Sequence, residues 1–157
     1  MASYFSKKVK HAYKCFKKGK PRKKVYAAVE KGDMFVVLNG RKGASYKYNL
    51  AGGSIEKRET AQKAIVRECL EELNMNVEFV KSLGVIQDKS KWNYKGEEFW
   101  VDDQMEIVLV KFISYGKNKS FGITGEFTEE DKPVEIAKEE MLNNVYEFTK
   151  GGIILDQ

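Results

Sequence analysis

Residues 52–74 read GGSIEKRETAQKAIVRECLEELN, and they carry the clearest pattern in the chain. Between Glu59 and Leu73 there is no glycine or proline, and the apolar residues recur at helical spacing. This spacing predicts an amphipathic helix with one face on the core. After glycine, asparagine is the residue best suited to a left-handed helix end, so Asn74 suits the position that follows. The stretch therefore predicts a turn after the two glycines, followed by one helix.

Three carboxylates on the predicted helix, Glu68, Glu71 and Glu72, lie at positions i, i+3 and i+4. At this spacing all three point to one side of the helix. Like charges placed in this way cost roughly 0.2–0.5 kcal/mol per pair, so the helix gains no stability from them. Mg²⁺ and Mn²⁺ prefer oxygen ligands and would offset the repulsion. The pattern therefore predicts a metal-binding face.

Arg67 and Glu59 are the other charged residues of interest in this stretch. If both were helical they would lie two turns apart, which is too far for a direct pair on one helix. Two interpretations stay open. Arg67 orients one of the helix carboxylates, or it meets Glu59 because the helix begins after Glu59.

The spacing of these residues resembles the Nudix box, Gly-x5-Glu-x7-Arg-Glu-U-x-Glu-Glu-x-Gly-U, in which U is aliphatic. The matching positions are Gly53, Glu59, Arg67, Glu68, Glu71 and Glu72. Three positions depart from the box: Arg58 replaces a frequent small residue, Cys69 stands at an aliphatic position, and Asn74 replaces the last glycine. None of these departures removes a charged position. The resemblance therefore implies a hydrolase with a complete acidic set.

The resemblance implies an α/β fold, an αβα sandwich with a mixed β-sheet between helices. It also implies Mg²⁺ or Mn²⁺ as the cofactor. The expected metal ligands are the carbonyl of Gly52, the carboxylates of Glu68, Glu72 and Glu71, and Glu130 from the loop before the last helix. Because Gly52 has no side chain, its backbone can approach a cation or a phosphate closely.

The implied reaction is hydrolysis of a pyrophosphate bond in a nucleoside diphosphate linked to another group. A pyrophosphate repels water, so metal ions that neutralise its charge and acidify a bound water meet the chemical need. The general base stays open between a helix glutamate and the loop acid. The expected catalytic residues are Glu59, Arg67, Glu68, Glu71 and Glu72.

Substrate selection lies outside the box. The candidate substrate-binding residues are Arg41, Lys42, Lys47, Gly53, Trp92 and Tyr94. The basic ones near the glycines suit phosphates, and the aromatic ones suit a nucleotide base, on which they would stack. The alternative for the aromatic residues is that they close the core.

Apolar runs outside the box predict the remaining elements. Alternating and β-branched runs predict strands at 25–29, 34–38, 77–87 and 103–113, the last in a central position. Residues 88–98 are polar and are predicted as a loop. Residues 133–148 contain apolar positions at helical spacing and are predicted as a second amphipathic helix.

The positive charge of the chain is concentrated at the N-terminus. Residues 1–24 hold ten of the 28 Lys and Arg residues and no acid, so residues 25–157, with 18 bases and all 23 acids, have a net charge of −5. Within this segment Phe5, Val9, Tyr13 and Phe16 recur at helical spacing, which predicts an amphipathic helix. We expect a basic N-terminal segment at 1–21 and a Nudix domain at 22–157.

Three interpretations of the basic segment stay open. Its apolar stripe docks on the domain with a solvated basic back, it attracts nucleotide phosphates or RNA, or, least favoured, it contacts an anionic membrane. We expect a nucleotide-type small molecule as the main partner, RNA as a second candidate partner, and no membrane. Whether the chain is a monomer or a homodimer is left open.

Composition places the chain in a broad class. With 157 residues, no run of 18 apolar residues and no secretory signal, it is expected to be one cytoplasmic domain. Its two cysteines have no metal-binding or redox spacing. Two alternatives to a nucleotide pyrophosphohydrolase are kept. One is an RNA 5′-pyrophosphohydrolase or decapping-type enzyme that uses the basic N-terminus, and the other is a non-hydrolytic nucleotide-binding regulator.

Overall fold

The computed structural model describes residues 4–40, 45–117 and 132–155. In these ranges the strands are β1 (Arg22–Lys31), β2 (Met34–Asn39), β3 (Tyr48–Asn49), β4 (Ala51–Ser54), β5 (Met75–Tyr94), β6 (Glu97–Tyr115) and β7 (Pro133–Ala137). The helices are α1 (Tyr4–Lys17), α2 (Ala61–Leu73), α3 (Lys138–Asn144) and α4 (Tyr146–Thr149).

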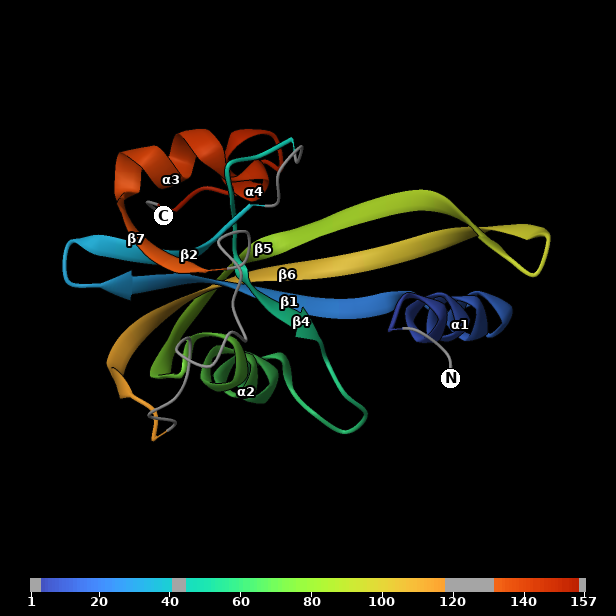
Figure 1. Ribbon diagram of the computed structural model, residues 1–157, viewed down its shortest axis with the longest axis horizontal. Coiled ribbons are helices and arrows are strands. Elements are labelled where there is room, and N and C mark those ends of the chain that lie inside the picture. Colours follow the sequence, from blue (N-terminus) through green and yellow to red (C-terminus); the bar gives the residue numbers. More distant parts are fainter. Residues whose placement is uncertain (1–3, 41–44, 118–131, 156–157) are drawn as a thin grey trace.

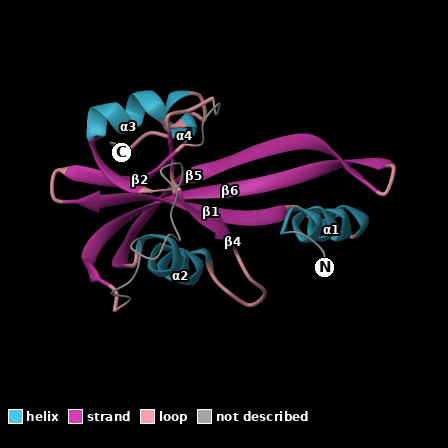
Figure 2. Cartoon of the chain, in the orientation of Figure 1, coloured by secondary structure: helices cyan, strands magenta, loops and turns pink. Residues whose placement is uncertain are grey.

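The described strands form one seven-stranded mixed sheet. Its order is β3-β2-β1-β6-β5, with β4 also paired to β1 and β7 to β2. The pairing of β1 with β6 is parallel, and the other pairings are antiparallel. Helix α2 lies on one side of the sheet and α3 with α4 on the other, as Figure 1 and Figure 2 show. The predicted αβα sandwich and the central position of β6 are confirmed.

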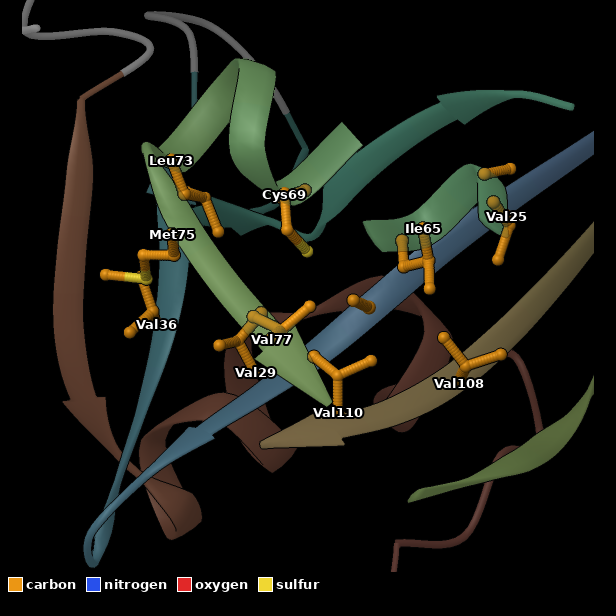
Figure 3. Packing of buried hydrophobic residues seen from close by; sticks show 13 residues of the cluster. Val25, Val29, Val36, Ile65, Cys69, Leu73, Met75, Val77, Val108 and Val110 are labelled. Carbon is orange, nitrogen blue, oxygen red and sulfur yellow. The ribbon is translucent and has the colours of Figure 1, made fainter. Parts of the chain in front are cut away.

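The apolar face of α2 packs on the sheet as its periodicity predicts. Ile65, Cys69 and Leu73 point from α2 toward valines of β1 and β6 (Figure 3). The helix ends at Asn74, whose φ of 54° and ψ of 41° are left-handed and whose N–H donates to the carbonyls of Cys69 and Leu70. Asparagine therefore closes this helix in place of the glycine of the box.

The two thiols of the chain are expected to differ in reactivity. Cys69 is fully buried, and its burial raises the pKa of the thiol to about 12, whereas Cys15 is half-buried. Because the thiolate is the nucleophile, the native protein at pH 8 should react with one equivalent of a thiol reagent, at Cys15. Mass spectrometry after alkylation checks the site, and both thiols should react in guanidinium. Equal labelling of both thiols in the native protein would contradict the packing of α2.

The loop predicted at 88–98 is wrong. β5 and β6 continue as an antiparallel hairpin from the pair Asp88–Asp103 out to the pair Tyr94–Glu97. Only Lys95 and Gly96 form the turn, both with positive φ. The polar residues of this stretch suggested a loop because most of them face solvent. The face that the hairpin buries is covered by α1, a partner distant in sequence.

The helix predicted at 133–148 is wrong in its first part. Residues Pro133–Ala137 form β7, which pairs with β2 along its whole length. Val134 and Ile136 are two residues apart, and both pack in the core with residues of β2. Their spacing therefore fits the two-residue period of a strand, which the structure adopts in place of the helical period. The helical part begins at Lys138 and is divided by the extended residue Val145.

Helix α1 docks on the outer half of the β5–β6 hairpin (Figure 1). Val9 and Ala12 are buried against Phe99 and Val101. The Tyr13 ring adds aromatic contacts with the hairpin, and its hydroxyl donates a hydrogen bond to Glu97. The amphipathic helix and the docking of its apolar stripe are confirmed. None of the helices in the described ranges has the length and apolar character needed to cross a bilayer.

A buried ion pair joins the start of β1 to β6. Arg22 donates from Nε and Nη2 to the two carboxylate oxygens of Asp103, at 2.6 and 2.8 Å, and the two side chains are 5% and 12% exposed. Removing one partner of such a pair leaves an uncompensated charge and typically costs about 3–5 kcal/mol. Asp103→Ala should therefore lower the midpoint of thermal unfolding by roughly 10 °C. Calorimetry checks this, with Asp33→Ala in the exposed β1–β2 turn as the control.

Candidate active site

The N-terminus of α2 fixes the position of Glu59. Thr60 caps the helix, because its hydroxyl accepts a hydrogen bond from the backbone N–H of Lys63. The helix thus begins at Ala61, and Glu59 lies before it. Arg67 donates from Nε and Nη2 to the Glu59 carboxylate at 2.9 and 3.0 Å. These bonds lower the pKa of Glu59 to about 2, so the pair stays ionised at any ordinary pH.

Arg67 also contacts two of the helix carboxylates. Its Nη1 donates to Glu68 at 3.0 Å and to Glu71 at 3.3 Å, and its Nη2 donates to the carbonyl of Ser54 at 3.1 Å. Both interpretations of Arg67 from the sequence therefore hold together. The guanidinium ties the turn before α2 to the acidic face of α2, so it positions that face relative to β4.

Glu68 lies directly against the backbone of β4. A Cβ atom added at Gly53 would come within 2.6 Å of the Glu68 Oε1, so any side chain at this position would displace the Glu68 carboxylate. Glu68 is only 9% exposed, and burial raises the pKa of its carboxyl. A buried carboxylate is costly unless cations surround it. Arg67 supplies part of that compensation, and a metal ion at the open side would supply more.

Glu72 contacts the neighbouring glycine. Its Oε2 accepts a hydrogen bond of 3.0 Å from the backbone N–H of Gly52. A Cβ at Gly52 would overlap the Val25 carbonyl and the Tyr26 backbone, so only glycine lets β4 run this close to β1. Glu68 and Glu72 therefore converge on the Gly52–Gly53 backbone, while Glu71 stays exposed on the rim.

The donor set suits a hard divalent cation. Within the described ranges no three His, Cys, Asp or Glu side chains gather closely enough to hold a metal ion by themselves. The residues present are two carboxylates beside the backbone of Gly52 and Gly53. Mg²⁺ is commonly bound in this way, by one or two carboxylates together with waters and substrate phosphates. Glu130, the predicted loop ligand, lies outside the described residues.

A pocket of about 510 Å³ opens beside these carboxylates. Four elements line it: α1, β1, β4 and α2. The lining residues are Lys7, Lys8, His11, Arg22, Lys24, Tyr26, Gly52, Gly53, Ser54, Glu56, Glu68 and Glu72. Its two sides differ in charge, because the carboxylates come from α2 and the turn before it, whereas the basic residues come from α1 and β1.

The predicted substrate-binding residues are spread over different places. Gly53 lines the pocket, whereas Arg41 and Lys42 lie outside the described residues. Lys47 is exposed, and its Nζ lies 3.4 Å from Glu140 on α3. Trp92 and Tyr94 belong to the cluster between α1 and the hairpin, where both contact α1. Of these six residues, only Gly53 belongs to the described lining of the pocket.

The pocket residues that sequence reasoning missed are those of α1 and β1. Lys24 and Tyr26 point into the pocket from β1, and burial lowers the pKa of Lys24 and raises that of Tyr26 to about 12. The ten basic residues before position 25 were the available signal. Their charge is evident in the sequence, but only the tertiary contact between α1 and the hairpin brings some of them to the acidic face of α2.

The profile of the NUDIX domain matches residues 20–141 of this sequence. The chain belongs to the NUDIX domain family. The residues that carry the resemblance to the Nudix box lie inside the matched range, and so do all seven strands of the described sheet. Among curated proteins, none matches this chain.

Solved structures share the NUDIX fold with this chain. A NUDIX hydrolase from Nitrosomonas europaea has a TM-score of 0.54 and 18% identity, over 80% of this chain and 78% of its own. A MutT NUDIX hydrolase from Burkholderia pseudomallei has a TM-score of 0.53 and 16% identity, over 80% and 86%. A UDP-X diphosphatase has a TM-score of 0.53 and 13% identity, over 87% and 60%.

Family membership decides the general reaction class. The predictions of a MutT-like NUDIX protein and of a Nudix pyrophosphohydrolase are confirmed. NUDIX hydrolases use divalent metal ions and act on nucleotide-type compounds.

Proposed function

We propose that this NUDIX protein hydrolyses a pyrophosphate bond in a nucleoside diphosphate linked to another group, with Mg²⁺ or Mn²⁺. The observation that carries the proposal is the convergence of Glu68 and Glu72 on the Gly52–Gly53 backbone at one wall of the pocket. These carboxylates and the Gly52 carbonyl are the proposed metal ligands. Glu71 on the rim and Glu130 from the loop are proposed as additional ligands.

The residues of the chain have distinct proposed tasks. A bound metal ion neutralises the phosphates and acidifies a water molecule. Arg67 holds Glu68 and Glu71 in position, and Glu59 fixes Arg67 through two hydrogen bonds. The absence of a side chain at Gly53 leaves room for the Glu68 carboxylate beside the β4 backbone. The proton of the attacking water passes to a helix glutamate or to the loop acid, which are the two candidate bases.

The expected substrate is a small molecule with a diphosphate. One structure with the same fold is named a UDP-X diphosphatase, which fits a nucleoside diphosphate joined to a second group. We propose Arg41 and Lys42, which lie outside the described residues, as phosphate-binding residues. Lys47, Trp92 and Tyr94 do not line the pocket, so we propose contacts with them only for a substrate that extends beyond it. A basic segment at 1–21, a NUDIX domain at 22–157 and a cytoplasmic location complete the proposal.

A second candidate is an RNA 5′-pyrophosphohydrolase. The observation that favours it is that α1 contributes Lys7, Lys8 and His11 to the pocket that contains Glu68 and Glu72. An RNA end presents the same phosphate anhydride as a free nucleotide, followed by a chain of phosphates that basic residues can bind. A regulator without hydrolysis is disfavoured, because the acidic set of the box is complete.

A substrate screen tests the proposal. Phosphate and nucleotide release should be measured with Mg²⁺, with Mn²⁺ and with EDTA. The substrates are nucleoside triphosphates, nucleoside diphosphate sugars, ADP-ribose, dinucleoside polyphosphates and RNA with a 5′-triphosphate. The expected result is metal-dependent cleavage of at least one nucleotide class and none with EDTA. Cleavage of RNA alone would select the second candidate, and activity in EDTA would reject the metal mechanism.

A further inference from the structure

Helix α1 forms a wall of the active-site pocket, although it lies outside the range that matches the NUDIX profile. The match begins at residue 20, whereas α1 spans Tyr4–Lys17. Three of its side chains, Lys7, Lys8 and His11, line the pocket opposite the carboxylates of α2. We call these three residues the pocket face of α1. The wall therefore comes from residues outside the range matched by the family model.

The pocket face is held in place by the opposite side of the same helix. Val9 and Ala12 are buried on the hairpin, and Tyr13 is fixed by ring contacts and by its hydrogen bond to Glu97. Further along the helix, the Lys17 Nζ lies 3.5 Å from the same glutamate. Because these contacts hold α1 in place along two turns, the backbone that carries its lysines has a fixed position at the edge of the pocket. A prepositioned group loses less entropy on binding than one on a mobile tail.

The lysines beside this pocket have no direct ion-pair partner among the described residues, although Asp103 stabilises the charge of Lys24 from a distance. Arg22, at the base of the pocket, is neutralised by Asp103. Lys7, Lys8 and Lys24 form no ion pair with a carboxylate in the described ranges. The aromatic contact of Lys8, 5.8 Å from the centre of the Trp92 ring, leaves its ammonium hydrogens available. Three ammonium groups therefore border a pocket whose far wall is acidic.

We propose that the pocket face of α1 binds the phosphates of a 5′-polyphosphate substrate that are not held by the carboxylate side. The inference rests on the proposed function, since it names the substrate class of the same pocket. A chain of three or more phosphates can span both walls, with one part on the metal side and the remainder on the lysines. A diphosphate linked to a neutral sugar has no charge left for α1.

Binding without turnover tests this wall directly. The probe is a nucleoside triphosphate with methylene bridges both between the α and β phosphates and between the β and γ phosphates, titrated by calorimetry in Mg²⁺. Lys7→Gln/Lys8→Gln should weaken its binding by roughly 10- to 100-fold, the loss of two charge-assisted contacts. Lys10→Gln/Lys14→Gln removes the same charge from exposed positions of α1 that do not line the pocket, and should change binding less than twofold.

The outcome separates this inference from the proposed hydrolysis. Unchanged binding of the probe to the Lys7→Gln/Lys8→Gln protein would contradict phosphate binding by α1, whatever the activity of that protein. Lys7→Arg/Lys8→Arg should retain binding, which excludes a merely structural role. Thermal unfolding of each variant checks that α1 stays docked. Because no product is formed, a failure to hydrolyse nucleotides does not affect this comparison.

The same variants distinguish a free nucleotide from an RNA end. RNA with a 5′-triphosphate and the same RNA with a 5′-hydroxyl should be compared. The pocket-face variant should lose the preference for the triphosphate. If Lys10→Gln/Lys14→Gln also weakens binding of the RNA but not of the nucleotide, the natural ligand is an RNA whose backbone runs along α1. If it weakens neither, the natural ligand is a free nucleotide.

Discussion

Glu72→Gln is expected to reduce kcat at least ~100-fold with the fold intact, since even residues that only support a metal ligand contribute 10- to 100-fold. The amide oxygen of glutamine can still accept the hydrogen bond from the Gly52 N–H, so the local geometry is kept. What the substitution removes is the negative charge that a divalent cation needs. Since it also relieves repulsion with Glu68, the midpoint of thermal unfolding should stay the same or rise slightly.

The measurement is product release over a titration of Mg²⁺ and of Mn²⁺, with metal binding followed separately by calorimetry. Glu78→Gln is the matched control, because it makes the same chemical change at an exposed position of β5. The control should retain full turnover and metal affinity. Turnover of the Glu72→Gln protein within twofold of the parent would remove Glu72 from the proposed ligand set.

Gly53→Ala is expected to lower kcat by roughly 100-fold, because a displacement of about 1 Å at a catalytic group can cost that much. The new methyl would lie within 2.6 Å of the Glu68 Oε1 and push the carboxylate away from the pocket. The hydrogen bond from Arg67 to Glu68 would be strained as well. Overpacking of this kind also costs about 1–3 kcal/mol of unfolding free energy.

Gly32→Ala separates the two effects of Gly53→Ala. Gly32 lies in the β1–β2 turn with a φ of +62°, and an added Cβ meets no atom within 4 Å. Its replacement strains the backbone and lowers stability without touching the pocket. Turnover per folded molecule should therefore fall only in the Gly53→Ala protein. Equal turnover in both variants would show that Glu68 tolerates displacement.

The sequence predicted the box well because its signals are local. Helix spacing, the Thr60 cap and the left-handed residue Asn74 are all encoded within a few residues of one another. Arg58 illustrates what a motif alone leaves out. It departs from the small residue common at its position, yet it adopts a φ of 67° in the turn before α2.

The elements that were mispredicted depend on distant partners. β7 became a strand because the edge of β2 is available to it, and residues 88–98 became a hairpin because α1 covers one of its faces. The basic wall of the pocket has the same origin. Lys7 and Glu68 are separated by most of the box and four strands, so no local pattern could have placed them in one cavity.

The length of β5 has a consequence for how copies of this chain behave at high concentration. In the described sheet, β5 has a neighbour on one side only, so its outer backbone groups could pair with a strand of another molecule. Lysines at positions 81, 89, 91 and 95 recur along this strand and its turn. Their mutual repulsion opposes edge-to-edge stacking, so neutralising them should favour fibre formation more than it alters the fold.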